Sequence, residues 1–470
     1  MSIASAFNAA RSALTVTGRW AEVTSNNISN ADRPEYTRRG LTLDSVGDAS
    51  GVRVAAVQRE MNAALDREYR LETGRVARQD TVAELLDAYT AKLGSPGTEG
   101  TVSARMTGLQ SSFDLLSANP ADPALQRNVL DAADGMTRSL NKASRDLKET
   151  TAAVTARIVG EVEVVNGMLG EVGEINRQIA IEEKGSRRMA VLEDQLATRL
   201  DGIAQVMDFT LERDAAGRAE LRTRSGAELV AGTQVTTISF DAASGALFAG
   251  ASEITPGETG VRGFGEGRLA GEIELRNAIL PQMELQLDEM AGALVAGFEM
   301  AEGLAGSPGL FTDAGAAYDP ASREGLAGRI TVNDAVRPEA GGALWRLRDG
   351  VSAATPGYAG DSTQITAYSD LLSGPVAYDP AAGLGTGITM TDYAAGLMAE
   401  QHAVRVDAET QAESLALGTE TIAHARAGLQ GVNIDEELQQ LMAVEQSYAA
   451  NSQVMRTLDD MMETLLAAIR

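Results

Sequence analysis

The chain has 470 residues, with 66 acidic and 40 basic side chains, a net charge of −26 and no cysteine. A field of that sign repels phosphate backbones, so we expect no nucleic-acid partner. The lack of cysteine excludes disulfides, thiolate zinc sites and cysteine nucleophiles. No stretch reaches the roughly 18 apolar residues of a membrane span, so we expect no membrane insertion. Only 4% of the residues are aromatic against 44% hydrophobic, and a core of Ala, Gly, Leu and Val favours long, closely packed helices.

The first predicted helix carries a narrow and weakly apolar stripe. Its members recur at alternating steps of four and three residues, and they are Ile3, Phe7, Ala10, Leu14, Thr17, Ala21, Thr24 and Ile28. A helix of this kind is marginal alone and needs a partner to cover it. It ends in the run 26–30 (NNISN) before Pro34, where turn-forming residues cluster.

Long helices are expected in the middle of the chain. After a short β-like connector, helical periodicity covers about 58–93, and a further helix of roughly sixty residues follows from Asp122. The best part of that helix is a nearly continuous coiled-coil-like seam of Val154, Ile158, Val162, Val165, Leu169, Val172, Ile175 and Ile179. Sixty helical residues span about 90 Å, which suits a rod-shaped domain.

The later part of the chain changes character twice before it becomes helical again. Residues 208–262 alternate in hydrophobicity between Gly-bearing turns, which predicts two hairpins in a small β-rich insertion. After helical residues at about 263–303, the segment 304–388 is rich in Gly, Ala, Pro and Asp and predicts an irregular, loop-rich segment. Helical periodicity then returns over about 389–430.

The closing helix is predicted from Ile434 to the end of the chain. Carboxylates in its first turn, at Asp435, Glu436 and Glu437, oppose the positive end of the helix dipole. We predict that its apolar residues form one face, and they are Ile434, Leu438, Leu441, Tyr448, Met455, Leu458, Met462, Leu465 and Ile469. Both chain ends therefore offer a striped helix, and the simplest arrangement is that each covers the other.

These segments predict a mainly α fold with paired terminal helices in a coiled-coil-like bundle, a long-helix rod domain and a small β-rich insertion. The expected units are 1–40 with 431–470 as a terminal helical assembly domain, 41–207 with 263–303 and 389–430 as the long-helix bundle, 208–262 as the insertion, and 304–388 as the irregular segment.

The sequence offers no convergent chemistry. Its two histidines, His402 and His424, lie about six turns apart on one predicted helix, too far for a shared metal, and we interpret them as solvated. The glycine-rich segment 263–271 lacks the preceding buried strand of a nucleotide-binding unit, so we interpret it as a flexible hinge into a helix. Acidic loops in 313–335 do not match the twelve-residue calcium loop. We therefore nominate no catalytic, cofactor-binding or metal-binding residue and expect no enzyme.

Two motifs carry a family resemblance. The segment 25–38, SNNISNADRPEYTR, resembles the N-terminal signature of the bacterial flagellar axial proteins, which are the rod, hook and hook-associated subunits. The matching residues are Asn26, Asn27, Ile28, Ser29, Asn30, Pro34, Tyr36 and Arg38. Arg33 and Glu35 depart from the signature, where Thr and Gly are usual. The segment from Gly431 resembles the closing helix of the family, with Asn433, Tyr448, Asn451, Leu458 and Leu465 among its matching residues.

Three features favour the hook-associated members that lie between hook and filament. They are the segment 431–437 (GVNIDEE), the segment 118–130 that opens the long helix, and the helical body between the ends. This resemblance implies a structural subunit of a junction collar, with the terminal helices innermost and disordered before assembly, and with a reduced outer domain at 304–388.

The same resemblance implies a set of partners and a location. The partners would be further copies of this chain, the flagellar hook protein, a second junction protein on the filament side and a flagellar export chaperone. The location would be the extracellular flagellum, reached by the flagellar type III route without a cleaved signal peptide, because no charged-then-apolar segment opens the sequence.

Two other interpretations stay open. A hook, rod or flagellin-like axial subunit would form a long polymer instead of a collar. A cytosolic coiled-coil adaptor is compatible with the helices alone, although the paired motifs at the two ends argue against it.

Overall fold

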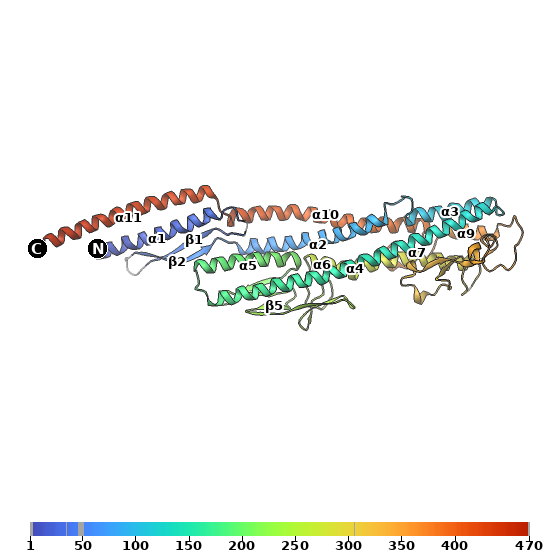
Figure 1. Ribbon diagram of the computed structural model, residues 1–470, viewed down its shortest axis with the longest axis horizontal. Helices are drawn as coiled ribbons and strands as arrows, with labels where there is room; N and C mark the ends of the chain where they lie inside the picture. The colour runs from blue at the N-terminus through green and yellow to red at the C-terminus, as the bar shows by residue number, and fades with distance from the viewer. Residues whose placement is uncertain (1–2, 34, 46–50, 305, 469–470) are drawn as a thin grey trace.

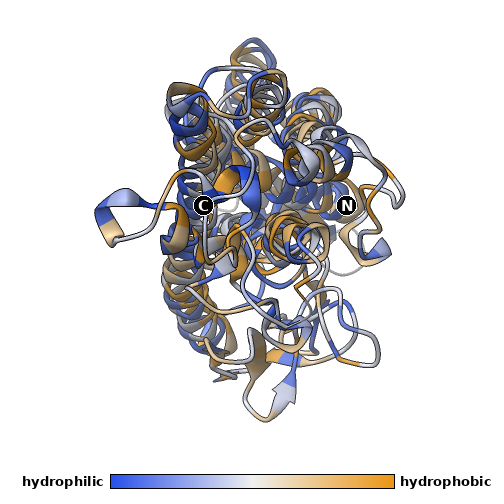
Figure 2. Cartoon of the chain, turned by 90° about the vertical axis from the view of Figure 1, so that its right-hand side faces the viewer, coloured by the Kyte–Doolittle hydropathy of each residue, from blue (hydrophilic) through white to orange (hydrophobic). Residues whose placement is uncertain are grey.

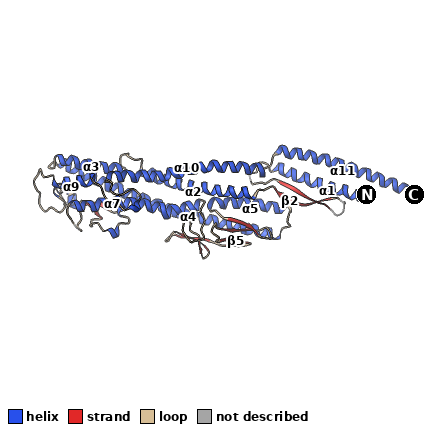
Figure 3. Cartoon of the chain, turned by 180° about the vertical axis from the view of Figure 1, so that it is seen from behind, coloured by secondary structure: helices blue, strands red, loops and turns tan. Residues whose placement is uncertain are grey.

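The computed structural model describes residues 3–33, 35–45, 51–304 and 306–468. The chain forms an elongated, mainly helical rod with both described ends at one tip (Figure 1). The principal helices are α1 (Ile3–Ser29), α2 (Ala63–Leu93), α3 (Val102–Ala118), α4 (Pro123–Ile181), α5 (Arg187–Val206), α7 (Leu280–Ala301), α10 (Met390–Gln430) and α11 (Ile434–Ala468). The predicted mainly α fold is confirmed, and strands are confined to small antiparallel pairs and sheets (Figure 3).

The first and last helices lie side by side at the tip that holds both termini (Figure 1). A hairpin of β1 (Arg39–Ser45) and β2 (Val52–Arg59) lies along α1, with Arg39 opposite Arg59 in the antiparallel register. We call α1, β1, β2 and α11 the terminal unit, and the segment from α2 to α10 the rod. Only two chain crossings join them, between β2 and α2 and between α10 and α11.

The rod is built around α4, a helix of 59 residues. Asp122 caps it by accepting a hydrogen bond from the Ala124 N–H (2.8 Å), and Pro123 occupies its first turn, where no N–H is required. All eight residues of the predicted seam from Val154 to Ile179 are buried. The long-helix prediction is therefore confirmed, with α3 and α5 packed on α4 and α10 packed along α2.

The glycine-rich segment before the predicted third long helix is a close-packing device and not a flexible hinge. Gly267 has φ +103°, and a Cβ there would lie 2.4 Å from the Val206 carbonyl oxygen. A Cβ on Gly271 would lie 2.7 Å from the Arg78 carbonyl oxygen of α2. Glycine is therefore needed for α6 (Arg268–Glu274) to cross α2 closely. A π-helical turn, η1 (Leu275–Ile279), separates α6 from α7.

The β-rich insertion is two small sheets held by α4. The strands are β3 (Thr210–Arg213), β4 (Ala219–Arg222), β5 (Glu228–Ala231) and β6 (Gln234–Val235) in one sheet, and β7 (Ile238–Asp241), β8 (Ala246–Ala249) and β9 (Ser252–Glu253) in the other. Both predicted hairpins form, as β3–β4 and β7–β8. Asn176 bonds the backbone of Ala219 and Gly232, and Asn166 pairs with the N–H and C=O of Ile238.

Residues 304–388 cover the far end of the rod (Figure 2) and have little regular structure, although they contribute buried side chains such as Phe311 and Tyr368 to the core. Its short elements are β10 (Phe311–Asp313), β11 (Ile330–Val332), α8 (Arg346–Asp349), α9 (Thr363–Ser373) and the 3₁₀ turns η2 (Pro320–Ser322), η3 (Leu326–Gly328), η4 (Asp334–Val336), η5 (Pro338–Ala340) and η6 (Pro380–Ala382). Phe311 and Tyr368 of this segment contact the ring of Phe298 on α7.

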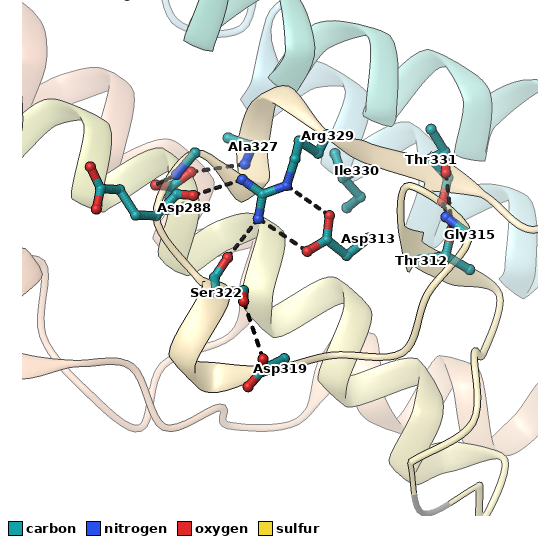
Figure 4. A network of polar contacts seen from close by, with 12 residues as sticks. Asp288, Thr312, Asp313, Gly315, Asp319, Ser322, Ala327, Arg329, Ile330 and Thr331 are labelled. Atoms are coloured by element: carbon teal, nitrogen blue, oxygen red, sulfur yellow. Dashed lines mark hydrogen bonds and ion pairs between the residues drawn. The ribbon is translucent and has the colours of Figure 1, made fainter.

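A polar network clamps this segment onto α7 (Figure 4). The buried carboxylate of Asp288 accepts hydrogen bonds from the N–H groups of Gly325 (2.6 Å) and Ala327 (2.8 Å). The Arg329 guanidinium binds both oxygens of Asp313 and donates to the Ser322 carbonyl oxygen. These side-chain bonds replace the backbone ladders of regular structure, which is why hydrophobic periodicity does not reveal the segment.

Candidate assembly site

The two ends of the chain meet where α11 begins. Asn433 caps that helix, since its Oδ1 accepts hydrogen bonds from the N–H groups of Asp435 (3.0 Å) and Glu436 (3.4 Å). The cap fixes the first turn of α11, and in that turn Glu437 points inward and is only 2% exposed.

Glu437 joins the two sequence motifs directly. Asn27 Nδ2 donates to Glu437 Oε2 (3.1 Å), and Arg38 Nε donates to Glu437 Oε1 (2.7 Å). The bond to Glu437 is the main reason why the pKa of the Arg38 guanidinium is raised above its usual value. The side-chain carboxylate of Glu437 is thus held by residues about 400 positions earlier in the chain. We call Asn27, Arg38 and Glu437 the clasp.

The buried amide of Asn27 also shapes the turn after α1. Its Oδ1 accepts hydrogen bonds from the Tyr36 hydroxyl (2.8 Å) and the Arg39 N–H (3.1 Å), and its Nδ2 donates to the Arg39 carbonyl oxygen (2.9 Å). Tyr36 is covered by the Arg39 guanidinium 4.7 Å above its ring, and burial raises the pKa of its hydroxyl. One side chain therefore organises both the turn and its contact with α11.

Arg38 ties the clasp to the rest of the chain through its backbone. Its N–H donates to the carbonyl oxygen of Gln430 at the end of α10 (2.8 Å), and its carbonyl oxygen accepts from the Glu60 N–H (2.9 Å). Its guanidinium also reaches the Glu60 carboxylate (2.9 Å). Three separate segments, at the end of α10, the start of α11 and the residue after β2, therefore converge on Arg38.

Other residues of the N-terminal motif have lesser roles. Asn26 donates to the Glu22 carbonyl oxygen and accepts from Arg187 of the rod (2.9 Å). Asn30 Nδ2 donates to the Asn26 carbonyl oxygen (2.8 Å), and Ile28 is half-buried. Pro34 lies outside the described residues, as does Ile469 at the other end.

The residues of the predicted face of α11 differ in burial. Leu458 is buried, while Leu441, Asn451 and Met455 are half-buried. The remaining predicted residues are exposed by 44–52%, and they are Ile434, Leu438, Tyr448, Met462 and Leu465. The most buried positions of α11 follow a seven-residue step from Glu437 to Val444 and Leu458. Sequence reasoning passed over Glu437 and Val444 because it chose Leu438 as the apolar residue of the first turn.

Large apolar side chains around α11 are left half uncovered. We call this set the outer face, and it comprises Ile434, Leu438, Met442, Tyr448, Val454, Met461, Met462, Leu465 and Leu466, each 44–63% exposed. The helix packed along α11 is α1, and it leaves these side chains half exposed even where they border it, as Met461 and Leu465 border Ile3. A further partner is needed to bury them. Six exposed carboxylates accompany this surface, and Arg456 is the sole basic residue in 434–468.

The two histidines lie in different environments. His402 is half-buried with Nε2 3.0 Å from the Gly94 carbonyl oxygen, so the prediction that it is solvated was wrong, whereas His424 is exposed. No group of three or more His, Asp or Glu side chains that could hold a metal occurs in the described part of the chain. Within the same ranges, no helix combines the length and apolarity that a membrane crossing requires.

Family models match this chain in two places. The model described as the helical domain of flagellar hook-associated protein FlgK matches residues 92–305, and the model of the C-terminal region of the flagellar basal-body rod proteins FlgEFG matches 430–468. The second match covers α11 and begins at Gln430, whose carbonyl oxygen accepts a hydrogen bond from Arg38 of the clasp. Together with paired terminal helices on a helical rod, these matches define a flagellar axial protein.

Within the flagellar axial proteins, the curated relatives of this chain are hook-associated proteins. Flagellar hook-associated protein 1 of Bacillus subtilis is 23% identical over 97% of this chain and 96% of its own length. The proteins of that name from Escherichia coli and Salmonella typhimurium are 23% and 25% identical over 37% of this chain and 32% of their own lengths. Together these similarities support identification of the chain as a FlgK-type flagellar hook-associated protein, a structural part of the bacterial flagellum that associates with other axial proteins.

One solved structure is also similar, that of the flagellar hook junction protein FlgK from Burkholderia pseudomallei. It covers 52% of this chain and 46% of its own, with a TM-score of 0.44 and 18% identity.

Proposed function

We propose that copies of this chain form a collar between hook and filament and assemble through the terminal unit. The observation that carries this proposal is the outer face of α11. Its nine large apolar side chains stay about half exposed although α11 is already packed against α1. Removing such a surface from water stabilises an assembly by about 25 cal/mol for each Å² buried. The family places the chain at the hook–filament junction, where neighbouring subunits are available to cover it.

The charges of the terminal unit favour a contact in which α11 of one copy meets α1 and the hairpin of the next copy. The outer face is flanked by exposed carboxylates such as Glu445 and Asp460, whereas α1 exposes Arg11. Arg19 of α1 and Arg53 of the hairpin are also exposed, and they are paired with Glu22 and Asp44. An acidic apolar surface on one copy attracts exposed guanidinium groups such as that of Arg11 on the next. A heterologous contact of this kind closes into a ring when the rotation between copies permits.

The proposal extends to partners and location. The hook protein would meet the collar on one side and a second junction protein on the filament side. An export chaperone would cover the terminal helices before assembly, and the chain would be exported to the extracellular flagellum. We propose no catalytic role, because the site is built from structural hydrogen bonds and apolar contacts.

The test replaces apolar residues of the outer face without disturbing the clasp. The variant Leu438→Asp/Met462→Asp should be exported but fail to join purified hooks, and cells that depend on it should lose motility. The matched control is Leu115→Asp, which places a charge at an exposed residue of α3 (59% exposed) far from the terminal unit. Normal incorporation of the double variant into the collar would refute assembly through this face.

A further inference from the structure

The contact between the terminal unit and the rod is made largely by polar groups. Away from the bond between Arg38 and Gln430 of α10, the rod side of this contact is made by α5 and the loop before it. The Val57 N–H donates to the Gly185 carbonyl oxygen (2.8 Å), and Arg187 reaches Glu22 and Asn26. The Arg187 and Glu22 side chains are 59% and 42% exposed, so this pair contributes little.

Open space flanks the contact on both sides. A cleft of about 680 Å³ lies between Tyr36 and Arg39 of the terminal unit and Ile175 and Val191 of the rod. A second cleft of about 500 Å³ lies between the hairpin and the loop that precedes α5. Among the residues that the structure describes, the two parts therefore touch along a narrow strip, and the apolar core of the rod does not extend into the terminal unit.

Within that strip, one carboxylate holds two buried guanidinium groups. Asp194 Oδ2 accepts from Arg39 Nη2 (2.8 Å), and its Oδ1 accepts from Arg59 Nε (2.7 Å). The side chains of Arg39, Arg59 and Asp194 are only 7%, 4% and 10% exposed. Arg39 and Arg59 also lie directly opposite each other on β1 and β2.

This arrangement depends on Asp194. Like charges at directly opposite positions of an antiparallel pair repel each other, and both cations are out of water. Asp194 comes from α5 of the rod, so the charge that relieves this repulsion in the terminal unit is supplied by the other part of the molecule. Removing it would leave a buried pair of cations, and the least costly response is to expose them by moving the hairpin away from α5.

We propose that Asp194 is the latch of a hinged joint, and that its release lets the terminal unit tilt relative to the rod while each part stays folded. The pivot lies at the two chain crossings, residues 60–62 and 431–433, where neither helix nor strand is formed. The Arg38 N–H to Gln430 carbonyl bond lies at this pivot. The hinge is a property of the single chain and does not rest on the collar proposal.

The test measures the angle between the two parts in the full-length chain. The chain has no native cysteine, so spin labels can be placed by Thr15→Cys in α1 and Glu163→Cys in α4, both exposed. A second pair, Thr15→Cys with Gln446→Cys in α11, reports whether the terminal unit itself stays folded. Distance distributions are compared for the parent, Asp194→Asn, the conservative variant Asp194→Glu, and the control Asp44→Asn, which removes an exposed hairpin pair with Arg53.

Asp194→Asn should shift or broaden the α1–α4 distribution and leave the α1–α11 distribution as narrow as in the parent. Asp194→Glu should restore most of the parent distribution, and Asp44→Asn should have no effect. An unchanged α1–α4 distribution in Asp194→Asn would overturn the latch. Equal broadening of both distributions would also overturn it, because Asp194 would then fold the terminal unit instead of orienting it.

Discussion

The clasp predicts that a single buried carboxylate controls the pairing of the two terminal helices. In Glu437→Gln the side chain keeps its size and loses its charge, so Arg38 loses its shortest ion pair and retains only the half-exposed Glu60. A hydrogen bond to a charged group contributes roughly 1.5–3 kcal/mol. We expect about 2 kcal/mol here, which corresponds to an approximately 30-fold increase in the opening equilibrium between α1 and α11.

Hydrogen exchange followed by mass spectrometry measures this opening directly. Amides of α1 and α11 should exchange about 30-fold faster in Glu437→Gln, while amides of α4 keep their protection. The matched control is Glu436→Gln, the exposed neighbour in the same turn, which should behave like the parent. Unchanged exchange in Glu437→Gln, or equal acceleration in the control, would show that the clasp does not hold the helices together.

Three further predictions concern the rod. Burial, followed by repulsion from Glu161, raises the pKa of Glu272 to about 7. Between about pH 4.5 and 7 the folded chain therefore keeps a proton on Glu272 that the unfolded chain has lost. The stability that depends on this proton is fully present below about pH 4.5 and is lost as the pH rises through 7. Glu272→Gln should therefore stabilise the rod against urea by up to about 3 kcal/mol at pH 8 and by little at pH 4.5, and a difference independent of pH would contradict the assignment. Asn176→Leu removes three hydrogen bonds to the insertion and should cost about 2–4 kcal/mol, seen as faster exchange in 210–235 while 238–253, held by Asn166, stays protected. Gly267→Ala should lower thermal stability by more than about 2 kcal/mol because of its φ of +103° and the nearby Val206 carbonyl, whereas Gly265→Ala, with open space around it, should not.

Hydrophobic periodicity predicted the long helices well because they bury continuous stripes. The seam from Val154 to Ile179 is buried as expected, and the start of α4 follows from the cap at Asp122 and the proline after it. The same reasoning found both main hairpins of the insertion. Strands as short as β6 and β9, at two residues each, carry too little periodicity to be found.

The clasp could be anticipated only in part. The two motifs were recognised, but Glu437 was interpreted as a dipole partner at the start of a helix, and Leu438 was preferred as the inward residue. A buried carboxylate is favourable there only because Asn27 and Arg38 donate to it, and those donors come from the other end of the chain. Steps of seven residues back from Leu458 and Val444 would have indicated Glu437.

The segment 304–388 shows a different limit of sequence reasoning. Its order depends on side chains that bind backbone groups far away in sequence, as Asp288 binds Gly325 and Ala327. Such contacts leave no local pattern, so composition alone predicted only the lack of regular structure.

We expect the outer face of α11 to be covered by neighbouring subunits in the flagellum. The most direct measurement introduces a single cysteine by Met462→Cys and compares its rate of modification by a maleimide in the free chain and in isolated hook–collar assemblies. We expect fast modification in the free chain and strong protection in the assembly, with Leu115→Cys reactive in both. Equal reactivity of the Met462→Cys chain in the two states would contradict the account.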